Sequence, residues 1–425
     1  MAEPRAKANL PFTAFRHRDF RLFWIGVVLS GFGSQFTSLA MAWQIYEMTG
    51  SPFQLGLLGL ARAIPSMMVL LLGGMLADAM DRRRLMMITQ AGQFLVTGWV
   101  LLLSISGSVT PTVFYVASAL LALFNGLENP ARQAFVPNVV PPADLTNALA
   151  LNSVQRNVAM IAGPSLAGVA LAAFGPTVNY AVDTASWLAM ISALLLIHPI
   201  LRGGAGRRAM SFQALGEGLA YVWTHPILLA MMLLDFVANV FGSPRGLFPI
   251  YAKDILMVGP EGLGIMSAVS SAAAIGAAAV MSAFSNIRRA GIGVLVSVAF
   301  YAACTVLFAI SQVFWFSLLM LAGQGIGNTV STVLRGTILQ LNIPDELRGR
   351  VSGVNQVFTN GGPQLSQFRG AGMAEWMGAE GSAGFGGLFC LGFVGLIWAA
   401  VPMVRHFEID SNPRVVTSAP ASGGR

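Results

Sequence analysis

Long apolar runs separated by short polar turns extend along almost the whole chain. A helix of about 20 apolar residues is long enough to cross the hydrocarbon core of a bilayer, and by this measure the sequence predicts twelve membrane spans. The first six are predicted at residues 22–45, 54–77, 85–106, 112–135, 147–173 and 178–200. The second six are predicted at 226–250, 261–284, 290–310, 313–338, 350–376 and 382–404. We therefore expect an all-α membrane protein.

The longest connection between predicted spans, residues 202–225, divides them into two sets of six. It begins with Gly and Arg residues and continues with apolar residues at helical spacing, which predicts a linker followed by an amphipathic helix on the membrane surface. The predicted parts are a cytoplasmic N-terminal segment at 1–21, a first six-helix bundle at 22–201, the linker and amphipathic helix at 202–225, a second six-helix bundle at 226–407, and a disordered cytoplasmic tail at 408–425.

Short motifs recur in the two predicted bundles at an offset near 200 residues. The matched stretches are 113–115 with 313–315, 142–145 with 344–347, and 163–166 with 362–365. Their shared order and spacing indicate that the two halves are homologous.

Composition agrees with many membrane spans, because only 10% of the residues are charged, against about 25% in a soluble domain. The net charge is +7. If the N-terminus is cytoplasmic, the outer loops hold only Lys253, whereas the inner segments hold many basic residues, among them Arg208, Arg289 and Arg335. Lys and Arg accumulate on the cytoplasmic side of membrane proteins. Both termini are therefore predicted to be cytoplasmic, and no nucleic-acid partner is expected.

The turn between the second and third spans, 73–84, reads Gly-Gly-Met-Leu-Ala-Asp-Ala-Met-Asp-Arg-Arg-Arg. Its pattern of Gly-x-Leu-Ala-Asp followed by basic residues resembles the signature loop of the major facilitator superfamily of transporters, although Asp81 stands where that loop usually has glycine. Four further stretches resemble the bacterial drug and siderophore (enterobactin) exporters within that superfamily. They are 20–26, 129–137, 247–254 and 361–365.

This resemblance covers about residues 15–407 and implies two six-helix bundles related by a pseudo-twofold axis. It also implies efflux of an amphipathic small molecule by alternating access, driven by the proton gradient without a bound cofactor. We expect a monomer in the bacterial cytoplasmic (inner) membrane, with membrane lipids and the small-molecule substrate as its partners. An importer and a lysolipid flippase of the same fold remain alternatives.

The resemblance also assigns a gate on the inner side of the membrane. It implies that Asp78 holds the two halves together, facing the positive N-terminus of the eleventh span, and we expect Arg82 and Arg83 to take part in this latch. Glu128 and Arg132 are four residues apart and share a helical face, so they are candidates for the same gate. The alternatives are a turn that only sets topology, and a local ion pair.

Two acids fall inside predicted spans, Asp183 in the sixth and Asp235 in the seventh. A charge within a span is costly unless it is paired or wetted, so both are candidates for proton coupling. Asp235 is slightly favoured, because it lies nearer to mid-depth and has Asn239 one turn further on. The alternative is a hydrogen-bonded strut between helices. Gly163 and Pro164 in the fifth span resemble an antiporter motif, and proline there removes a backbone hydrogen bond, so this pair is a candidate hinge or a static kink.

Several arginines and amides also fall inside spans and are candidates for a polar central cavity that would suit an anionic cargo. The candidates are Gln35, Arg62, Asn152, Arg156, Asn239 and Arg369. Alternatively, Arg156 neutralises Asp235 and Arg369 neutralises Glu375. Arg245 also falls within a span, and the sequence assigns it no role.

The sequence also lacks the motifs of other classes. It has no Gly-x-x-x-x-Gly-Lys-Ser/Thr loop, and its only lysines are Lys7 and Lys253, which excludes an ATP-driven pump in this chain. Cys304 and Cys390 both lie in apolar spans, so no disulfide or metal site is expected. We do not expect an enzyme, and a membrane-embedded enzyme is the alternative from a different class.

Overall fold

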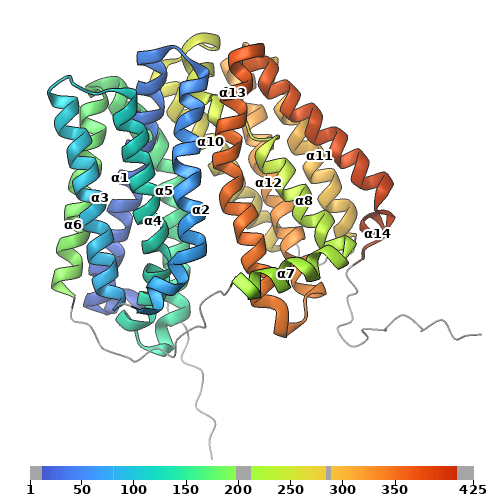
Figure 1. Ribbon diagram of the computed structural model, residues 1–425, viewed down its shortest axis with the longest axis horizontal. Helices are drawn as coiled ribbons and strands as arrows, with labels where there is room; N and C mark the ends of the chain where they lie inside the picture. Colours follow the sequence, from blue (N-terminus) through green and yellow to red (C-terminus); the bar gives the residue numbers. More distant parts are fainter. Residues whose placement is uncertain (1–11, 80, 198–211, 284–288, 409–425) are drawn as a thin grey trace, which may run out of the picture.

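The computed structural model describes residues 12–79, 81–197, 212–283 and 289–408, and the part of the chain within these ranges folds into helices without a β-strand. Two groups of helices lie side by side in Figure 1, with α1 to α6 on the left and α8, α11 and α12 on the right. Helices α2 and α13 face each other where the groups meet. The chain therefore forms two helical halves joined through α7.

The first half consists of α1 (Arg18–Thr49), α2 (Pro52–Ala79), α3 (Arg82–Ile105), α4 (Pro111–Val139), α5 (Leu145–Phe174) and α6 (Pro176–Leu196). Helices α2, α4 and α6 each begin with proline, whose missing N–H costs nothing at the first helical position. Asp81 caps α3, because its side chain accepts a hydrogen bond from the backbone N–H of Arg84 at 3.0 Å. Local signals thus set most of these helix starts.

The second half begins after α7 (Phe212–Thr224), which lies across the lower end of this group in Figure 1. Its elements are α8 (Pro226–Val240), η3 (Arg245–Leu247), α9 (Phe248–Ile250), η4 (Tyr251–Ile255), α10 (Gly259–Ala283), α11 (Ala290–Ala309), α12 (Phe314–Asn342), α13 (Asp345–Ala400) and α14 (Pro402–Arg405). Gly378 interrupts α13 with φ 75° and ψ 165°, so α13 is two consecutive helices. This break coincides with the predicted boundary between the last two spans.

Nine helical segments within the described ranges are long and apolar enough to cross a membrane. Helices α2 and α12 are not among the nine, and the two helices of α13 are counted once. The prediction of twelve spans fits this arrangement and stays a prediction. The all-helical fold itself is confirmed.

The halves meet along two helix pairs, α2 with α13 and α5 with α10. Glycine makes both approaches close. A Cβ atom on Gly168 of α5 would lie 2.5 Å from the carbonyl oxygen of Pro260, and one on Gly59 of α2 would lie 2.8 Å from that of Gln364. Small residues allow such backbone contact where lipid and protein are equally apolar. The two halves therefore approach each other closely along these two helix pairs.

Candidate functional site: a polar cavity between the halves

A cavity of about 340 Å³ lies between the two halves. Helices α1, α2 and α5 line it from the first half, and η3, α9, α10 and α13 line it from the second. Its polar lining residues are Gln35, Ser38, Arg62, Arg245, Ser267, Ser271, Gln364 and Gln367. Its apolar lining includes Leu39, Met160, Phe248 and Leu263. The cavity can therefore hold a small molecule that has both polar and apolar parts.

Two arginines, one from each half, line this cavity. Arg62 of α2 donates a hydrogen bond to the hydroxyl of Ser38 at 3.0 Å, and Arg245 of η3 donates one to the hydroxyl of Ser270 at 3.5 Å. The residues that line the cavity include no Asp or Glu. The cavity is therefore positively charged.

Arg245 is the charged cavity residue to which the sequence assigned no role. The polar lining residues that were not predicted either are Ser38, Ser267, Ser271, Gln364 and Gln367. The signal that identifies Arg245 lies directly before it, at 242–244, where Gly-Ser-Pro ends α8. Pro244 lacks the N–H that a continuing helix requires, so the chain changes direction and resumes at η3. A charged residue directly after a break in a span is placed to face a cavity rather than lipid.

Of the predicted cavity residues, Gln35 and Arg62 line the cavity, and Asn152, Arg156, Asn239 and Arg369 lie outside it. Arg156 is exposed and donates to the hydroxyl of its α5 neighbour Ser153 at 3.4 Å. Asn239 donates to Asp235 instead. Of the three arginines predicted for one cavity, Arg156 and Arg369 therefore lie outside the described cavity, and each has its described partners elsewhere.

Arg369 donates hydrogen bonds to backbone carbonyls at the C-terminal end of α8. It donates to the backbone carbonyls of Val240 at 2.9 Å and Phe241 at 3.1 Å, and its guanidinium lies 5.2 Å from the centre of the Phe241 ring. The last carbonyls of a helix have no partner within it, so Arg369 supplies one. The proposed pairing of Arg369 with Glu375 is wrong, because Glu375 instead contacts the start of α2.

Asp235 pairs with Arg335 of α12, and the alternative in which Arg156 neutralises it is wrong. A carboxylate oxygen of Asp235 lies 2.5 Å from the Arg335 guanidinium, and both residues are buried. Asn239 donates to Asp235 at 2.8 Å, and the hydroxyl of Thr359 donates from α13 at 3.2 Å. The sequence reasoning counted Arg335 as a basic residue of an inner segment, whereas it is 4% exposed within the bundle.

Asp183 lies in a different environment, between α6 and α1 of the first half. It is 1% exposed, and its carboxyl group lies beside Thr37 and Trp187 and accepts a long hydrogen bond from Ser186 at 3.4 Å. A Cβ atom on Gly33 of α1 would lie 2.7 Å from it. No cation pairs with Asp183 in the described part of the chain. Asp183 is thus a buried acid with neutral hydrogen-bond donors around it.

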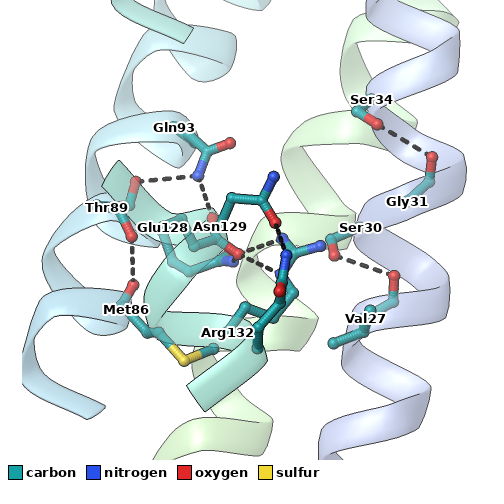
Figure 2. Close-up of polar contacts among 12 residues, drawn as sticks. Val27, Ser30, Gly31, Ser34, Met86, Thr89, Gln93, Glu128, Asn129 and Arg132 are labelled. Atoms are coloured by element: carbon teal, nitrogen blue, oxygen red, sulfur yellow. Dashed lines mark hydrogen bonds and ion pairs between the residues drawn. The ribbon is translucent and has the colours of Figure 1, made fainter. Parts of the chain in front are cut away.

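Glu128 and Arg132 form an ion pair on α4, which lies between α3 and α1 in Figure 2. Gln90 and Gln93 of α3 donate to the two carboxylate oxygens of Glu128 at 2.8 and 2.7 Å. Glu128 is 1% exposed. The described contacts of this cluster remain within the first half. The structure therefore contains the local ion pair, which was the alternative to a gate between the halves.

The predicted gate residues whose side chains are described also contact the first half. Arg82 donates to the carbonyl of Ala134 at 3.2 Å, and Arg83 donates to that of Leu194 at 2.7 Å. Asp78 lies outside the residues whose side chains the structure describes. The latch through Asp78 therefore stays a prediction.

Polar contacts join the two halves at the opposite end of the helices. The hydroxyl of Tyr46 near the end of α1 donates to Asp254 of η4, and Lys253 lies 5.4 Å from the centre of the Tyr46 ring. Glu375 of α13 accepts from the hydroxyl of Ser51 at 3.1 Å and from the backbone N–H of Phe53 at 3.0 Å. These contacts join the two halves at the end of the helices that the charge distribution predicts to be outer.

Pro164 lies inside α5 and lines the cavity, and its neighbour Gly163 faces α1. A Cβ atom on Gly163 would lie 2.6 Å from the side chain of Gln35. Glycine here permits close packing of α1 and α5. The hinge at Gly163 and Pro164 stays a prediction.

Two helical halves with a polar cavity between them form the major facilitator fold. Solved structures with this fold include a bacterial homologue of the iron transporter ferroportin in an inward-facing state (TM-score 0.70, 14% identity, covering 92% of this chain and 99% of that one). They also include the nucleoside transporter NupG (TM-score 0.72, 12% identity, covering 92% and 100%). At these identities the likeness concerns the fold alone.

The family follows from the sequence comparison. A family model described as a transmembrane secretion effector matches residues 9–421, and the chain belongs to this family of the major facilitator superfamily. Relatives are the multidrug efflux pump Tap of Mycolicibacterium fortuitum (25% identical, covering 92% of this chain and 98% of Tap) and the enterobactin exporter EntS of Salmonella choleraesuis (26%, covering 90% and 91%). The predicted resemblance to drug and siderophore exporters is confirmed. The chain is a multi-pass inner-membrane transporter, not an enzyme.

Proposed function

We propose that the protein exports an amphipathic small molecule across the inner membrane by alternating access, in exchange for protons. The observation that carries the proposal is the cavity of mixed polarity between the halves, together with the contacts that cross from one half to the other at one end of the helices. Relatives that export a siderophore and drugs support an outward direction. The energy source is the proton gradient, and no cofactor is required.

Alternating access needs two arrangements of the halves. With both termini cytoplasmic, as the positive-inside rule predicts, the contacts of Tyr46 and Glu375 close the outer side, and the cavity opens inward. Breaking these contacts while the halves rock about the close glycine contacts of α2, α5, α10 and α13 would open the outer side. The latch through Asp78 would then close the inner side.

Of the two acids inside spans, Asp183 is the better candidate for proton coupling. Asp235 is neutralised by Arg335 and held by three helices, which suits a strut. Asp183 lacks a cation among its described contacts, and a buried charge without a counterion is costly. A carboxyl group in that position gains by taking up a proton, which is what a proton carrier must do.

Transport by inverted membrane vesicles tests this function. The vesicles are energised so that their lumen is acidic, and uptake of enterobactin and of amphipathic drugs is measured together with the lumenal pH. We expect uptake that a protonophore abolishes, and a substrate-dependent loss of lumenal protons that Asp183→Asn removes. The double variant Asp235→Asn/Arg335→Met, which takes away both charges of the buried pair, should keep this proton loss. Uptake only by vesicles of the native orientation would identify an importer. Translocation of lysolipids alone would identify a flippase.

A further inference from the structure

The cavity contains positive charge without a fixed counterion. Arg62 and Arg245 line it from opposite halves, and the lining has no acidic residue. The described hydrogen bonds of these two side chains go to neutral serine hydroxyls, one from each guanidinium. A guanidinium group carries five N–H donors, so most of the donors of both groups remain available to a ligand or to water.

Three other arginines within the helices have partners that the protein itself supplies. Arg132 and Arg335 pair with acids, and Arg369 donates to two backbone carbonyls. An unpaired charge at membrane depth is costly and is retained where it has a function or faces water. Arg62 and Arg245 thus differ from the structural arginines both in their partners and in their position on the cavity.

We propose that the cargo carries an acidic group, a carboxylate or a similar planar oxyanion, which Arg62 and Arg245 bind together. This inference rests on the proposed export function. The planar fork of a guanidinium matches a carboxylate with two parallel hydrogen bonds. Amide groups of Gln35 and Gln367 provide further donors at the cavity wall, and Phe248, Leu39 and Met160 provide an apolar surface for the rest of the molecule.

The position of the two arginines gives the acidic group a second effect. Arg62 is on α2 of the first half, and Arg245 is on η3 of the second. An anion held by both side chains connects the two halves through one ligand, and it also lowers the repulsion between the two positive charges. The acidic cargo therefore stabilises the arrangement in which both halves enclose the cavity, and a neutral analogue of the same shape does so less.

Binding of matched acid and amide probes tests this inference. Benzoate, 2-naphthoate and 1-pyrenecarboxylate are each compared with the corresponding carboxamide, using the full-length protein in nanodiscs without an ion gradient. We expect at least one acid to bind about tenfold more tightly than its amide, which corresponds to about 1.4 kcal/mol. Arg62→Gln and Arg245→Gln each reduce this preference to less than about threefold. Arg62→Lys and Arg245→Lys retain part of it.

The matched control is Arg156→Gln, because Arg156 is exposed on α5 outside the cavity. It removes the same charge and leaves the preference unchanged, and the thermal unfolding of each variant establishes that it is folded. Amides that bind as well as acids, an absence of binding by all three acids, or a preference that survives both Gln variants would overturn the inference. Since binding is measured without a gradient, a failure of export with the acid preference intact refutes the proposed function alone.

Discussion

The two halves of the protein neutralise an arginine at nearly the same position in different ways. Arg132 lies ten residues before Pro142, and Arg335 lies nine residues before the matching Pro344, so the two occupy nearly equivalent positions on α4 and α12. Arg132 pairs with Glu128 on its own helix, whereas Arg335 pairs with Asp235 on α8. The first pair is local, and the second connects helices that are about a hundred residues apart in the sequence.

This difference teaches that a repeated fold does not require repeated contacts. Position 331 on α12, four residues before Arg335, holds serine where α4 has Glu128. Without an acid on its own helix, Arg335 depends on Asp235, and Asp235 in turn accepts from Thr359 of α13. The ion pair of the second half thus connects α8, α12 and α13, whereas that of the first half lies within α4 and is joined only to α3, through Gln90 and Gln93.

The largest loss of stability is expected for Asp235→Asn. This change leaves the guanidinium of Arg335 buried without its anion, and breaking a buried ion pair from one side costs about 3–5 kcal/mol. We expect a strong fall in the thermal unfolding temperature of the protein in detergent, measured by intrinsic fluorescence. The double variant Asp235→Asn/Arg335→Met should recover part of the loss, because it removes both charges. Near-normal stability of Asp235→Asn would contradict the role of a strut.

A smaller loss is expected for Glu128→Gln in the first half. The side chain of Arg132 is 26% exposed, so its charge can reach water once the carboxylate is gone. The loss of stability then comes from the hydrogen bonds of Gln90 and Gln93, which must rearrange around the new amide. A buried donor left without a partner costs about 1–3 kcal/mol. The same unfolding measurement should rank Glu128→Gln clearly above Asp235→Asn in stability. The reverse order would mean that the local pair is the more important of the two.

The sequence predicted the fold well and the polar contacts poorly, for physical reasons. Apolar run length identified the helices, and even the break at Gly378 falls between two predicted spans. The partner of Asp235 was missed because pairing depends on which faces of distant helices meet, and apolar periodicity within one helix does not contain that information. Arg335 was assigned to an inner loop because it lies near the end of an apolar run.

The candidate cavity was predicted in part, for the same reason. Arg62 lies in an uninterrupted apolar run, where a charge is conspicuous, and the structure places it in the lining. Arg369 is equally conspicuous, yet it is used to satisfy carbonyls that became free when Gly242 and Pro244 ended α8. The sequence shows that a charge within a span is unusual. It does not show that Arg369 lies beside the end of α8 and donates to backbone carbonyls there, whereas Arg62 lines the cavity.

Moving the acid tests the comparison directly. In Asp235→Asn/Ser331→Glu, the new glutamate stands four residues before Arg335, as Glu128 stands before Arg132. Ser331 is buried, and its backbone carbonyl already accepts from Arg335 at 3.3 Å. We expect the second change to restore about 1–2 kcal/mol of the stability lost in Asp235→Asn, since the larger side chain also crowds the core. Ser331→Gln in the same background has nearly the same size without the charge and should restore nothing.

The smallest effect is expected for Thr359→Val, which removes the hydroxyl that donates to Asp235 from α13 at 3.2 Å and keeps the shape of the side chain. A hydrogen bond to a charged group contributes about 1.5–3 kcal/mol, but Asp235 retains Arg335 and Asn239, so we expect the loss to lie near the lower value. In an Asp235→Asn background the substitution should cost less, because a neutral partner accepts a weaker bond. A double-mutant cycle measures this coupling. Equal costs in both backgrounds would show that the ion pair does not hold α13. The pair of the second half would then connect only α8 and α12.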